Sequence, residues 1–82
     1  MTHKYYPRVL EQLWRHGVQP TPATPPQLVH DFVNDLYRYE LRRLRDQLRR
    51  GEIPKPQYFD RVVEVRLRYP LLGLKAWQWV EP

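Results

Sequence analysis

The chain has 82 residues, a length that suits one small domain, so we expect a single domain over residues 1–82. It contains neither cysteine nor serine, which excludes disulfides, thiolate metal sites and nucleophiles of both types. Its 14 Lys and Arg residues outnumber its 9 Asp and Glu residues and give a formal net charge of +5. This balance suits nucleic acid, an acidic partner protein, a membrane surface or plain solubility.

Apolar residues at three- and four-residue spacing define three amphipathic segments. The predicted helices cover about residues 6–16, 25–50 and 56–69. Pro7 and Pro25 suit a first helical turn, where a missing N–H costs nothing, and Gly17 and Gly51 suit helix ends. The proline-rich stretch 17–26 predicts a stiff connector. We therefore expect an all-α fold, a small three-helix domain with a long central helix.

The stretch 57–80 permits a second interpretation. Between Val63 and Tyr69, apolar and polar residues alternate strictly, which is typical of a strand. Pro70–Gly73 would then turn the chain into a hairpin with residues 74–80. We favour a helix, because the chain before this stretch is helical and a lone hairpin needs cover from other elements. The β-hairpin remains the alternative.

The C-terminal tail, residues 71–80, has the sequence LLGLKAWQWV and is too apolar to extend into water. We expect it to fold back as a short segment that closes the core. The alternative is that Trp77 and Trp79 form an exposed aromatic patch, because tryptophan is a favoured anchor of protein interfaces. Such a patch would bind a partner protein or a second copy of the chain.

A line of arginines on the second predicted helix is the strongest surface feature. It consists of Arg38, Arg42, Arg45 and Arg49, whose spacing places them on one line opposite the apolar face. Guanidinium groups in this pattern suit phosphates or carboxylates. The alternative is that they complement the helix dipole, with Asp31 and Asp35 near the start of the helix. The predicted binding residues are Arg38, Arg42, Arg45, Arg49, Lys75, Trp77 and Trp79.

Catalytic and metal-binding patterns are missing from the sequence. Its histidines are scattered, its glycines are isolated, and its carboxylates have arginine neighbours along the chain. We expect no catalytic residues, no metal site, no cofactor and no enzymatic activity. No apolar run approaches the ~20 residues of a membrane span, and the first residues are mixed in character. We therefore expect a cytoplasmic protein without a membrane partner.

These observations favour a non-enzymatic protein–protein interaction or self-association module, which binds a partner protein or forms a homodimer. An excess of aromatic residues on a short chain, with three Trp and six Tyr, supports this prediction. The alternative function is a nucleic-acid-binding accessory protein that uses the basic helix face.

Overall fold

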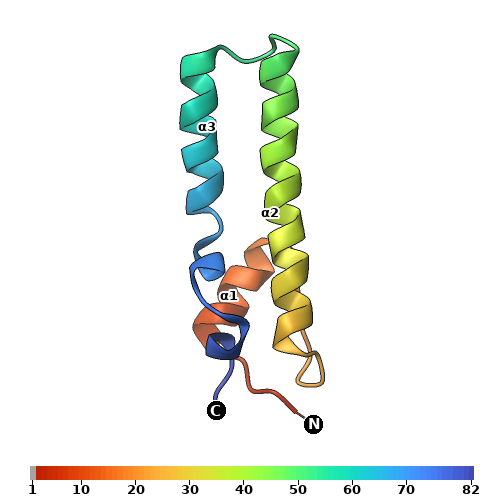
Figure 1. The fold of residues 1–82 in the computed structure, drawn as a ribbon. Helices are drawn as coiled ribbons and strands as arrows, with labels where there is room; N and C mark the ends of the chain where they lie inside the picture. The colour runs from red at the N-terminus through yellow and green to blue at the C-terminus, as the bar shows by residue number, and fades with distance from the viewer. Residues whose placement is uncertain (1) are drawn as a thin grey trace.

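The computed structural model describes residues 2–82 as three helices followed by two short 3-10 turns (Figure 1). The helices are α1 (Pro7–Arg15), α2 (Pro26–Arg49) and α3 (Lys55–Leu67), and the turns are η1 (Pro70–Gly73) and η2 (Ala76–Trp79). The predicted all-α fold with a long central helix is confirmed. The β-hairpin alternative is wrong, because residues 2–82 contain no strand beyond one isolated bridge between Tyr5 and Val80.

Helices α2 and α3 form an antiparallel hairpin, and α1 and the two turns pack around its lower half (Figure 1). The hairpin turn starts at Gly51, whose φ of +74° lies in the left-handed region that favours glycine. Gly17 ends α1 in the same way, with a φ of +75°. Because α1 and the two turns pack around the lower half, the upper half of the hairpin consists of α2 and α3 alone (Figure 1). Both chain ends lie at the lower end of the molecule, opposite the hairpin turn.

The α2–α3 interface explains why the sequence of the third segment shows both helical spacing and strand-like alternation. One line on α3 faces α2 and contains Tyr58, Val62 and Val65, with Tyr69 continuing it beyond the helix end. These residues are buried or half-buried, as their spacing of four, three and four residues predicts for one helical face. Val63 and Leu67 are exposed on the opposite side. The alternation from residue 63 to residue 69 arises because Val65 and Tyr69 belong to the buried face of α3, whereas Val63 and Leu67 belong to its exposed face.

The C-terminal tail closes the core, as predicted. Trp79 is fully buried beside Leu13 and Val33, and its indole N–H donates to the carbonyl oxygen of Leu71 at 3.3 Å. The backbone N–H of Tyr6 donates to the Trp79 carbonyl at 3.1 Å, and the Glu81 N–H donates to the Lys4 carbonyl at 2.9 Å. The tail is therefore fastened to the start of the chain as well as to α2.

The molecule is long and narrow, with principal extents of 49 × 18 × 17 Å. Its radius of gyration is 15.1 Å, whereas a compact domain of this length has a radius of gyration of about 12 Å. Its accessible surface is 6305 Å², about 1,000 Å² more than the roughly 5,300 Å² of a typical monomer of this mass. The hairpin shape therefore leaves more surface exposed to water than a compact fold would.

Candidate interaction surfaces

The arginine line lies on the outer side of α2, away from α3 and the core. Arg38, Arg42, Arg45 and Arg49 are all exposed, in agreement with the predicted face. Within residues 2–82, none of the four lies within 4.0 Å of a carboxylate, whereas Arg15, Arg50 and Arg68 each pair with a glutamate. The guanidinium groups of the line therefore remain available to a ligand.

A second line on α2 is apolar and was not predicted as a surface. It contains Leu28, Phe32 and Tyr39, each of which is more than half exposed. The spacing of four and seven residues places the three side chains on one stripe of the helix. Asp35 lies one helical turn after Phe32 and one turn before Tyr39, between the two apolar side chains. Apolar periodicity alone does not separate Phe32 from the core residues, because it does not reveal which apolar stripe of a helix packs against a neighbour.

A third line lies on the outer face of α3 and contains Phe59, Val63 and Leu67 at four-residue spacing. Each of these side chains is more than half exposed, on the side of α3 that faces away from α2. The sequence signal was present, because the third segment carries more apolar residues than one buried face requires. We refer to these two features as the α2 apolar line and the α3 apolar line.

The two tryptophans of the tail have opposite surroundings. Trp77 is 72% exposed, whereas Trp79 is 0% exposed and its ring lies 5.1 Å from that of His30. The prediction of Trp79 as a binding residue is therefore corrected, because its side chain fills the core. Trp77 and Lys75 remain on the surface.

The predicted binding residues do not form one site. The tail packs near His30 and the chain ends, whereas the arginine line extends toward the hairpin turn (Figure 1). His30 and Arg45 are 15 positions apart on one helix, which corresponds to about 22 Å. A ligand would therefore have to span about 22 Å to contact the tail and Arg45 together.

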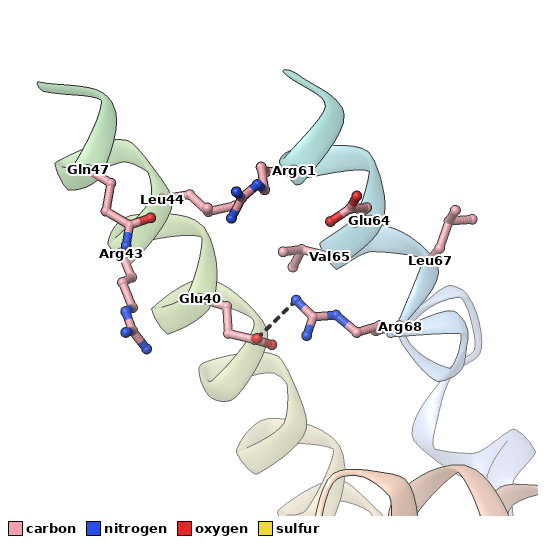
Figure 2. Close-up of a pocket in the computed structure, with 9 residues that line it drawn as sticks. All are labelled: Glu40, Arg43, Leu44, Gln47, Arg61, Glu64, Val65, Leu67 and Arg68. Carbon is pink, nitrogen blue, oxygen red and sulfur yellow. Dashed lines mark ion pairs between the residues drawn. The ribbon is translucent and has the colours of Figure 1, made fainter. Parts of the chain in front are cut away.

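A groove of mixed charge runs between α2 and α3 on one side of the hairpin (Figure 2). Arg68 reaches across it from α3, and its guanidinium lies 3.2 Å from the Glu40 carboxylate on α2. Arg43 and Arg61 also line the groove, and Leu44 and Val65 form its floor. No buried polar group points into the groove, so we interpret it as the solvated edge of the hairpin contact.

Tyr69 links all three helices at the lower end of this groove. Its hydroxyl donates to the Glu40 carboxylate, and its ring stacks on His16 at a centroid distance of 4.2 Å. His16 Nε2 in turn lies 2.7 Å from the Arg68 carbonyl oxygen, which ties α1 to the end of α3. Burial raises the pKa of Tyr69 above its ordinary value of 10.0, and the hydrogen bond to Glu40 raises it further. This cluster joins the end of α1 and the end of α3 to α2, and we interpret its contacts as structural.

Metal and membrane sites do not emerge from the part of the chain that the structure describes. Across residues 2–82, no three His, Asp or Glu side chains converge as metal ligands would. None of the described helices combines the length and apolarity that a bilayer crossing requires. Comparison of the chain with protein-family models, with curated proteins and with solved structures gives no match.

Proposed function

We propose that this chain is a non-enzymatic, cytoplasmic protein–protein interaction module that associates with copies of itself. The observation that carries the proposal is the surplus of exposed surface, about 1,000 Å² beyond that of a typical monomer of this mass. A stable interface removes about 800 Å² from each partner, so one interface would account for most of the surplus.

The composition of this surface agrees with the proposal. Ten large hydrophobic side chains are exposed in the described chain, and six of them form the two apolar lines on α2 and α3. Large exposed apolar patches mark interaction sites in soluble proteins, whereas scattered apolar residues do not, and the side chains of these two lines are aligned rather than scattered. The two-helix upper half of the hairpin also gains cover when another helix packs against it.

The test is light scattering after size exclusion, over a wide range of protein concentration and at low and high salt. We expect a discrete oligomer whose population rises with concentration. High salt weakens the charged contacts and leaves the apolar contacts in place, so the oligomer should persist there with lower affinity. A monomer at every concentration and at both salts would refute the proposal.

A second candidate function is nucleic-acid binding through the arginine line, which is favoured by its exposure and by the lack of ion pairs along it. Phosphate contacts release counterions, so such binding would weaken steeply with salt. Replacing Arg45 and Arg49 by Gln should flatten the salt slope by about two units, roughly one for each lost phosphate contact. Binding to single-stranded RNA that does not change with salt would refute this function.

A further inference from the structure

We propose that two copies of the chain pair antiparallel along α2, about a two-fold axis that passes near Leu36. In this arrangement Phe32 of one copy packs against Tyr39 of the other. The inference rests on the proposed self-association and adds to it the surface, the orientation and the charge pairs that fix the register.

The apolar contact comes from the α2 apolar line. Leu28, Phe32 and Tyr39 share one stripe, and each is more than half exposed. An antiparallel copy meets this stripe in reverse order, so Phe32 meets Tyr39 twice around the two-fold axis. The midpoint of these two residues falls between positions 35 and 36.

The orientation comes from a charged line beside the apolar one. This line contains Asp31, Asp35, Arg38 and Arg42, at a spacing of four, three and four residues that keeps them on one side of the helix. Its first two members are acidic and its last two are basic. In an antiparallel two-fold pair, each flank of a helix meets the same flank of its partner in reverse order.

Reversal of this line brings opposite charges together. Asp35 then lies opposite Arg38 of the second copy, and Asp31 lies opposite Arg42. The midpoint of both pairs is position 36.5, within about one residue of the midpoint of Phe32 and Tyr39. A parallel pair would instead set this line against the opposite flank of the partner helix, so Asp35 would not meet Arg38 and Asp31 would not meet Arg42. The charges therefore favour one orientation and one register.

These charged groups have few competing partners within the chain. Asp35, Arg38 and Arg42 make no ion pair in residues 2–82, and Asp31 accepts one hydrogen bond, from the Gln27 side chain at 2.8 Å. All four are exposed. They can therefore reach a second copy without breaking an interaction of the first.

The α3 apolar line does not carry the same inference. The residues that flank it on one side, Asp60 and Glu64, are both acidic and exposed. An antiparallel copy would oppose acid to acid there, which disfavours the pairing. On α2 the charged line changes from acidic to basic between Asp35 and Arg38. On this flank of α3, Asp60 and Glu64 are both acidic and no such change occurs.

Charge reversal provides the test. The basic variant carries Asp31→Arg and Asp35→Arg, and the acidic variant carries Arg38→Asp and Arg42→Asp. Each variant alone opposes like charges across the axis, so we expect its dimerisation to weaken at least tenfold. An equimolar mixture opposes Arg to Asp at all four contacts, so it should form a one-to-one heterodimer, measured by sedimentation and native mass spectrometry.

A matched control reverses two charges on α3, with Asp60→Arg and Glu64→Arg, and should leave dimerisation unchanged. Circular dichroism establishes that each variant remains helical, and recovery of the dimer in the mixture excludes misfolding as the cause. If the wild type dimerises and the α2 variants dimerise equally well, the antiparallel arrangement is refuted while self-association stands. A wild type that stays monomeric refutes both proposals.

Cysteine cross-linking tests the orientation independently, since the chain has no cysteine of its own. A mixture of Leu28→Cys and Arg43→Cys copies places the two thiols on facing turns of the antiparallel pair. We expect a bismaleimide to cross-link the mixture and to leave either variant alone uncoupled. Efficient cross-linking of Leu28→Cys with itself would place the helices parallel and overturn the inference.

Discussion

The two tryptophans of the tail form a matched pair for a test of the fold. Trp79 is fully buried against the core, whereas Trp77, two residues earlier, is 72% exposed. We expect Trp79→Ala to destabilise the domain severely and Trp77→Ala to change its stability by no more than about 0.5 kcal/mol. The two substitutions remove the same side chain, so any difference reports its surroundings.

The size of the effect follows from what Trp79 contacts. A buried aromatic side chain removes roughly 150–250 Å² from water, and truncation of such a residue to alanine costs about 3–5 kcal/mol. The substitution also leaves the Leu71 carbonyl oxygen without the indole N–H that it accepts at 3.3 Å. A domain of this length has a total unfolding free energy of about 4–12 kcal/mol, so Trp79→Ala should remove a large part of it.

The assay is urea unfolding followed by circular dichroism, which does not depend on tryptophan fluorescence. With a slope of about 1 kcal/mol/M for so small a protein, Trp79→Ala should lower the urea midpoint by about 3 M or abolish folding. All variants are compared at one protein concentration, because self-association contributes to stability. Equal midpoints for the two alanine variants would refute the assignment of Trp79 to the core.

The remaining predictions concern the junction at Tyr69, the hairpin turn and the hairpin contact. Tyr69 keeps its proton in the folded state because its pKa is raised, so its contribution to stability is complete below about pH 10 and is lost as pH rises toward the folded pKa. Tyr69→Phe should therefore flatten the fall in the urea midpoint as pH rises above about 10, and an unchanged slope would contradict this. Gly51→Ala should cost about 1 kcal/mol, because a Cβ there meets no neighbour and only the φ of +74° is strained, and a thermal melt of the variant measures this cost. Leu44→Ala should lower the free energy of unfolding by about 2–5 kcal/mol, because Leu44 is buried in the hairpin contact. Leu67→Ala should leave the urea midpoint of the monomer nearly unchanged, because Leu67 is exposed.

Local sequence rules predicted the elements well. Proline near the first turn and glycine at the end placed α1 and α2 to within about two residues, because these residues act through their own backbone. The tail was expected to cover the core from its apolar composition alone, and Trp79 does so. In each case the deciding interaction is short in range or requires only that apolar surface be buried.

The surfaces were harder to predict, because exposure depends on which helix packs against which stripe. Phe59 and Tyr58 are neighbours of similar character, yet Tyr58 faces α2 and Phe59 faces water. Trp77 and Trp79 were paired in one predicted patch, although η2 turns one ring inward and the other outward. Tyr69 and Arg68 contact Glu40 from 29 and 28 positions away in the sequence, which no local pattern indicates.

The charged line on α2 can be explained by the helix dipole or by pairing between copies. The two explanations require the charges at different positions along the helix. The dipole favours acids in the first turn and bases in the last turn, whatever the neighbouring side chains are. Yet Asp35 and Arg38 lie near the middle of a 24-residue helix, where the dipole has little effect. Pairing requires the sign change to coincide with the midpoint of Phe32 and Tyr39, and these two positions lie within about one residue of each other. The explanations also separate by experiment, because a dipole effect is independent of protein concentration and a pairing effect vanishes on dilution.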